Sequence, residues 1–179
     1  METYEIASIV FLVSVGTGLV ASAGLSHPVE TDSHSETAEK THEHALFHVV
    51  INGSEKDFTD QKFQLNARSV HLENNKSRIV HKHRTGVEWK DFLETINTTY
   101  WRSNSTGNLC LSIYQETHCG TGGIYLNSEK AADLDREISQ GDNLLIILNT
   151  DNKTAVVEKY MKKQLPPEYK PASKRGKRV

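Results

Sequence analysis

Hydrophobic residues are concentrated at the N-terminal end of this 179-residue chain. Ile6–Ala23 carries no charge over 18 residues, close to the roughly 20 residues that span a bilayer core. Ala21–Ala23 has the small residues of a signal-peptide cleavage site. The residues before the run lack Lys and Arg, however, which favours an uncleaved anchor. We therefore expect residues 1–24 to form a transmembrane anchor or a signal segment.

The next stretch is polar and has no apolar periodicity. Residues 25–44 are rich in Ser, Thr and Glu, which predicts a flexible linker. The linker contains His27, His34, His42 and His44. Histidine-rich tracts bind Zn, Cu or Ni, but the irregular spacing here is more typical of a solvated tether.

From Ala45 onward the pattern becomes that of a β-rich domain. Ala45–Ile51 is an apolar run that ends at a hairpin turn, Asn52-Gly53, and Lys56–Leu65 is expected to be the return strand. A second hairpin is expected from Ser69–Glu73 and Arg78–His83. Further strands are expected at Asn108–Tyr114, Gly123–Asn127 and Asn143–Asn149.

One helix is expected between these groups of strands. Trp89, Phe92, Leu93 and Ile96 recur at helical spacing, which predicts a helix over Val87–Asn97 with Thr85 as a cap. Ser128–Ile138 is expected to be a short helix or turn, and Gly120–Gly123 a flexible turn. This order predicts an α+β domain over residues 45–158, a small mixed sheet crossed by one helix, with a β-grasp (ubiquitin-like) architecture favoured.

The net charge of −2 conceals a basic C-terminal end. Residues 159–179 contain eight Lys and Arg and three prolines, and we expect them to form a disordered tail that does not pack. The rest of the chain is acidic, and few aromatic residues are interleaved with the basic ones, which argues against nucleic-acid binding.

Two features predict that the domain faces the outside of the cell membrane. Cys110 and Cys119 are the only cysteines, and an even count in an exported chain indicates a disulfide. Their spacing is not that of a C-x-x-C redox motif, although free, reactive thiols stay an alternative. The Asn-X-Ser/Thr glycosylation pattern occurs at Asn52, Asn75, Asn97, Asn104 and Asn152.

The second hairpin carries the densest set of chemically active side chains. A five-residue loop from Asn74 to Arg78 would pair His71 with His81, because side chains alternate along a strand. The two residues would then share one face with His83 and Glu73, a set that fits Zn or Cu, whereas a one-residue slip would separate them. The alternative is a polar, solvent-facing stripe without metal.

These segments resemble those of an archaeal family of membrane-anchored extracytoplasmic proteins. The family carries a His-Leu-Glu-Asn segment (His71–Asn74 here), a His-x-His-x-Thr-Gly segment (His81–Gly86 here) and a paired-cysteine loop. The resemblance covers about residues 45–149 and implies an archaeal surface protein with a β-rich fold. It implies no settled function, and the basic tail departs from the family pattern.

Three functional hypotheses follow from these patterns. The first is a non-catalytic, single-pass membrane module that binds a protein of the envelope or of a membrane complex. The second is a copper- or zinc-binding domain that uses the histidine cluster, and the third is a thiol–disulfide redox protein. No P-loop, dinucleotide-binding glycine pattern or nucleophile elbow occurs, which argues against an enzyme.

Overall fold

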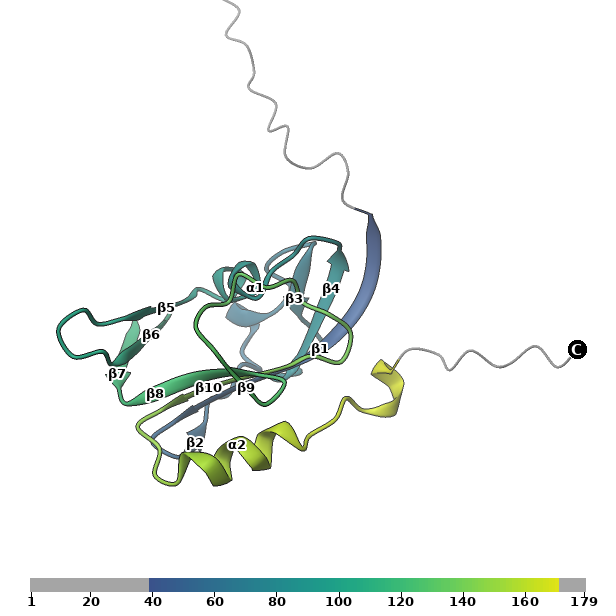
Figure 1. Cartoon of the computed structure of the whole chain (residues 1–179). Helices are drawn as coiled ribbons and strands as arrows, with labels where there is room; N and C mark the ends of the chain where they lie inside the picture. The colour runs from purple at the N-terminus through teal and green to yellow at the C-terminus, as the bar shows by residue number, and fades with distance from the viewer. Residues whose placement is uncertain (1–38, 171–179) are drawn as a thin grey trace, which may run out of the picture. The chain divides into compact units, whose positions relative to one another are not determined.

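The computed structural model describes residues 39–170, which form an α+β fold with two sheets (Figure 1). The larger sheet has the strand order β3-β4-β1-β10-β8-β9, with the short β2 paired to the end of β1. Its strands are β1 (Lys40–Ile51), β2 (Ser54–Glu55), β3 (Val70–Leu72), β4 (Ile79–Arg84), β8 (Gly122–Leu126), β9 (Glu129–Ala131) and β10 (Asn143–Leu148). The smaller sheet contains β5 (Thr98–Arg102), β6 (Leu109–Ile113) and β7 (Glu116–Gly120).

The centre of the larger sheet is a parallel pair of buried strands. β1 and β10 are parallel, with Leu46 opposite Asn143 and Ile51 opposite Leu148. Antiparallel strands flank them on both sides, β4 beside β1 and β8 beside β10. β10 is buried along its whole length, as its unbroken apolar sequence predicts.

Two helices cover opposite faces of this sheet (Figure 1). On one face, α1 (Trp89–Thr95) and the smaller sheet pack against the alternate residues of β1, such as Phe47 and Val49. On the other face, α2 (Lys153–Met161) covers Val50, Leu145 and Ile147 through Tyr160. The alternation of side chains along each strand therefore gives the sheet two buried faces.

Several local expectations differ from the structure. α1 begins later than expected, and the backbone N–H of Glu88 donates to the Asp91 carboxylate, whereas Thr85 accepts a hydrogen bond from Glu39. Within Lys56–Leu65 there is no strand but a short 3-10 turn, Gln61–Phe63. Ser128–Ile138 contains β9 and an irregular loop instead of a helix.

The glycine-rich segment is an ordered strand junction and not a flexible turn. β7 ends at Gly120 and β8 begins at Gly122. A Cβ atom on Gly122 would collide with the carbonyl oxygen of Ile147 on β10. Glycine is needed there because the two backbones approach too closely for a side chain.

Residues 159–170 also pack, although they belong to the expected disordered tail; the rest of that tail, residues 171–179, lies outside the described residues. α2 continues to Met161, and a 3-10 turn covers Pro167–Tyr169. Leu165 is buried against Leu46 and Ile79 on the sheet face next to α2. Among residues 39–170 there is no helix long and apolar enough to cross a membrane. The expected hydrophobic segment, Ile6–Ala23, lies outside the described residues.

Candidate metal centre

The β3–β4 hairpin has the register expected from the sequence. His71 pairs with His81, and Leu72 pairs with Val80. Leu72 and Val80 lie in the main core. Because side chains alternate, the two histidines lie on the opposite face. The apolar pattern and the loop length were therefore sufficient to place these two rings side by side.

β1 brings two further histidines to the same face. β1 begins at Lys40, so the last residues of the expected linker are part of a strand. His44 lies opposite His81, with ring centroids 4.7 Å apart. The ring of His42 lies 4.9 Å from that of His83, beside a β-bulge between Lys40 and Glu43. Bulges commonly re-aim a side chain next to a functional site.

Three of these histidines form a group that suits one metal ion. Among the described residues, the ligand atoms of His42, His81 and His83 all lie within 4.8 Å of one another. Tetrahedral zinc with Zn–N bonds near 2.0–2.1 Å places its nitrogens about 3.3 Å apart. The rings therefore need only a small inward movement, and His42 has the freedom for it because it is exposed.

Within residues 39–170, the His81 ring makes none of the hydrogen bonds that a buried imidazole normally makes. Its side chain is 3% exposed, and neither ring nitrogen has a hydrogen-bond partner in that part of the chain. Nδ1 lies 3.4 Å from the Glu73 carboxylate, but the geometry is not that of a hydrogen bond. A buried polar nitrogen left unsatisfied is costly, and a bound ion is one way to satisfy it.

Burial keeps several of these rings neutral. Loss of solvation lowers the pKa of His81 to about 4, although the nearby Glu73 carboxylate opposes this effect. Burial also lowers the pKa of His44, with a further contribution from His42. The pKa of His83 is lowered by burial and then by the charge of His71. Metals bind the neutral imidazole, so these rings are in the binding form at neutral pH.

His71 and Glu73 lie beside the three-histidine group. The Glu73 carboxylate is 3.4 Å from a ring nitrogen of both His71 and His81. The other ring nitrogen of His71 is 2.6 Å from the carbonyl oxygen of Ala67 and donates to it. A carboxylate next to histidine rings is the usual arrangement around a metal, where it orients the ligands.

The C-terminal segment forms one wall of the site. The Tyr169 ring lies 5.0 Å from the ring of His44 and 5.5 Å from that of His81. Gln140 links this segment to β1. Its side-chain amide nitrogen donates to the carbonyl oxygen of Tyr169, and its side-chain oxygen accepts from the backbone N–H of His44. Residues expected in the disordered tail thus contribute to the burial of His81.

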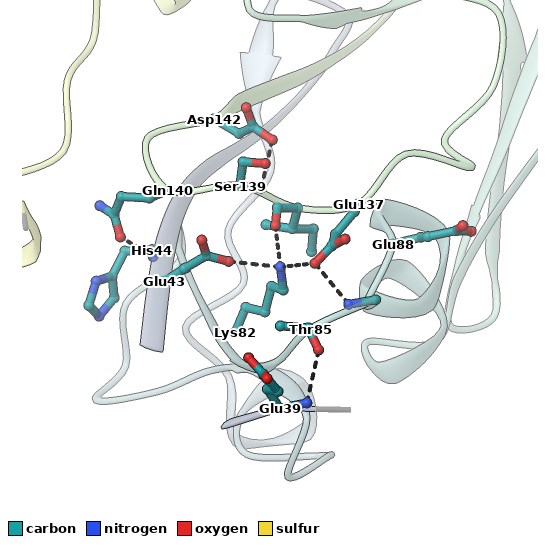
Figure 2. A network of polar contacts seen from close by, with 12 residues as sticks. Glu39, Glu43, His44, Lys82, Thr85, Glu88, Glu137, Ser139, Gln140 and Asp142 are labelled. Atoms are coloured by element: carbon teal, nitrogen blue, oxygen red, sulfur yellow. Dashed lines mark hydrogen bonds and ion pairs between the residues drawn. The ribbon is translucent and has the colours of Figure 1, made fainter. Parts of the chain in front are cut away.

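A buried lysine holds β1 and β4 together directly beneath the histidines. Figure 2 shows the ammonium group of Lys82 between the carboxylates of Glu43 and Glu137, at 2.7 and 2.6 Å. The carbonyl oxygen of Ile138 accepts a third hydrogen bond. Burial alone would lower the pKa of Lys82, but the hydrogen bonds and charges of the two carboxylates raise it. The lysine is therefore charged and fixes the pairing of Glu43 with Lys82, next to His42 and His44.

The two cysteines form a disulfide, as expected. Cys110 on β6 lies directly opposite Cys119 on β7, and the two sulfur atoms are bonded. The pair belongs to the smaller sheet, whereas the histidines lie on the larger one.

No protein-family model, curated protein or solved structure matches this chain.

Proposed function

We propose that this chain is a membrane-tethered, extracytoplasmic module that binds one copper or zinc ion through His42, His81 and His83. The observation that carries the proposal is the convergence of the His42, His81 and His83 imidazoles; the ring nitrogens of His81 are buried and have no hydrogen-bond partner among the described residues. The ligand set differs from the one expected from the sequence, because His42 takes the place of His71 and Glu73 supports the rings.

The chemistry of the donors restricts the ion. The three groups are imidazoles, which suit Zn, Cu(II) and Ni, and no thiolate or thioether is among them. Three protein ligands leave one coordination position open for water or for a group of a second molecule. An ion held by one exposed ligand, His42, and two more buried ones, with one position open, suits a module that stores or passes on metal.

The placement outside the membrane is part of the same proposal. Its support is the uncharged segment Ile6–Ala23 and the Cys110–Cys119 disulfide. A β-grasp classification is also proposed. It is supported by the central parallel pair of β1 and β10 and by α1 on one face of the sheet.

Metal content measured after loading tests the proposal. The full chain, without an affinity tag of histidines and with His27→Ala and His34→Ala, is loaded with Zn(II), desalted and analysed for bound metal. We expect about one equivalent, and loss of that equivalent in His81→Ala. The matched control is His118→Ala, which removes a partly buried histidine on the smaller sheet and should retain the ion. Equal metal in all variants, or none in any, would refute the site.

A further inference from the structure

The five asparagines of the glycosylation patterns occupy equivalent positions in the fold. Each is exposed and lies in a connection between elements or at an element boundary. Four of them have positive φ angles, which places them in tight turns. The five are Asn52 after β1, Asn75 between β3 and β4, Asn97 after α1, Asn104 between β5 and β6, and Asn152 before α2.

Within residues 39–170 their side-chain amide nitrogens donate no hydrogen bond, which distinguishes them from every other asparagine in that range except Asn108. Where two of them do bond, they use Oδ1: Asn75 accepts from Gln61, and Asn152 accepts from the backbone N–H of Ala155. Both bonds are compatible with a substituent on Nδ2.

The remaining asparagines mostly use the same atom for structure. The asparagines outside the pattern, except Asn108, each donate a hydrogen bond from Nδ2 to a neighbouring oxygen. These donors are Asn66, Asn74, Asn127, Asn143 and Asn149. The Ser or Thr hydroxyl of each pattern is also accessible, since four are exposed and Ser77 is partly buried. Apart from Asn108, the asparagines of residues 39–170 whose amide nitrogen the fold leaves unused are therefore those of the pattern.

We propose that these five asparagines carry N-linked oligosaccharides. In the transfer, Nδ2 attacks the anomeric carbon of an oligosaccharide held on a lipid phosphate. A C–N bond forms, the anomeric C–O bond breaks, the amide loses one proton and the lipid phosphate leaves. The donor lipid and the membrane transferase are supplied by the compartment. The proposal rests on the extracytoplasmic placement in the proposed function and does not depend on metal binding.

Two of these sites lie at the end of the larger sheet away from the histidines. Asn52 follows the C-terminal end of β1, and His42 lies near its start. At about 3.3 Å per residue the two are about 30 Å apart along the strand. β10 runs parallel to β1 with Leu148 opposite Ile51, so Asn152 lies beyond the same end. Glycans on Asn52 and Asn152 thus leave the histidine end accessible to metal or to a partner.

Two of the glycans also flank an exposed sheet edge. β5 is an edge strand of the smaller sheet and presents Trp101, which is 42% exposed. Asn97 precedes this strand and Asn104 follows it. Open strand edges with exposed apolar residues promote association between chains, and bulky polar groups at both ends would prevent it.

Translation of the full chain with membranes that contain an oligosaccharyltransferase tests the proposal. We expect five stepwise mobility shifts, all removed by an amide-cleaving glycosidase that converts each modified Asn to Asp. Thr99→Ala and Ser54→Ala should each remove one step, and the matched variants Thr99→Ser and Ser54→Thr should keep it. Asn108 should stay unmodified.

Unmodified asparagines in a translocated chain, recognised by its Cys110–Cys119 disulfide, would overturn the proposal. A chain that is not translocated at all would overturn it too, together with the extracytoplasmic placement. Metal content measured on the same preparations reports separately on the histidines, so glycan loss with metal retained points to the glycosylation proposal alone.

Discussion

His44 on β1 and His81 on β4 lie directly opposite each other, with ring centroids 4.7 Å apart. This pairing joins the β3–β4 hairpin to the strand that enters the domain, and it brings His42 within reach of His83. The candidate metal centre therefore depends on the pairing of β1 with β4. Besides the backbone ladder of the two strands, the ion pair of Lys82 with Glu43 beneath the rings supports this pairing, and Glu137 pairs with the same lysine.

Replacement of Lys82 by Met should destabilise the protein and weaken metal binding. The ammonium group is buried, and its loss leaves two carboxylates without their partner. Removing one partner of a buried pair costs up to about 5 kcal/mol, and because Glu43 and Glu137 are partly exposed we expect about 2–4 kcal/mol. Urea denaturation measures the change. Lys90→Met, which breaks an exposed ion pair with Glu88 and Asp135, should leave the unfolding midpoint nearly unchanged.

Loss of the disulfide should affect stability but not the metal. Replacing both Cys110 and Cys119 by Ala opens a short loop, which costs about 2–4 kcal/mol through the entropy of the unfolded chain. Metal content should stay the same because the pair lies on the smaller sheet. A thiol–disulfide activity abolished by this variant would instead support the redox hypothesis.

The stability of the metal-free protein should fall as the pH is lowered from 7 to 5. Burial lowers the pKa of both His48 and His81 to about 4 from 6.5, so the unfolded chain binds more protons between these values. The contribution of these two neutral rings to the stability is fully present above about pH 6.5 and is lost as the pH falls toward 4. Each histidine contributes on the order of 2 kcal/mol between pH 7 and pH 5. Urea titrations at these pH values measure the slope.

One variant serves as a control for this pH effect. His81→Phe keeps a ring in the buried position and should reduce the slope by about half. A stability that is flat between pH 7 and pH 5 would contradict the assignment of both rings as buried and neutral.

His42 and His71 should have different effects on a bound ion. His42→Ala removes a ligand, so the Cu(II) electron paramagnetic resonance spectrum should show one fewer coupled nitrogen. His71→Ala removes a ring that lies beside Glu73, and changes of this kind typically cost 10–100-fold in affinity without altering the ligands. The opposite pattern, with a nitrogen lost only in His71→Ala, would favour the ligand set predicted from the sequence.

The hairpin could be predicted from the sequence because its pattern is local. Val70, Leu72 and Val80 alternate with polar residues, and the five-residue loop places all three in the core, whereas a one-residue slip would not. The first residues of β1 could not be predicted as a strand, because the inward-facing side chain there is that of Glu43 and not an apolar one. Its partner Lys82 is 39 residues away, and a buried ion pair leaves no hydrophobic alternation. A protein shortened to the apparent domain start at Ala45 would lack His42 and His44.

The C-terminal helix was missed for a related reason. α2 buries Tyr160 fully, while its other apolar residues are only partly covered, so its amphipathic pattern is weak. The sequence feature that could have predicted this helix is Asn152, whose side-chain oxygen caps the helix by accepting a hydrogen bond from the backbone N–H of Ala155. The place of Tyr169 beside His81 depends on Gln140, a contact between distant segments that no local pattern indicates.

The most direct test of the metal centre is an imidazole nitrogen NMR spectrum of the full, nitrogen-15 histidine-labelled chain, recorded during titration with Zn(II). We expect one equivalent to shift the ring nitrogens of His42, His81 and His83, while those of His48 and His118 stay unchanged. Shifts confined to His27 and His34, or an unchanged spectrum after one equivalent, would contradict it.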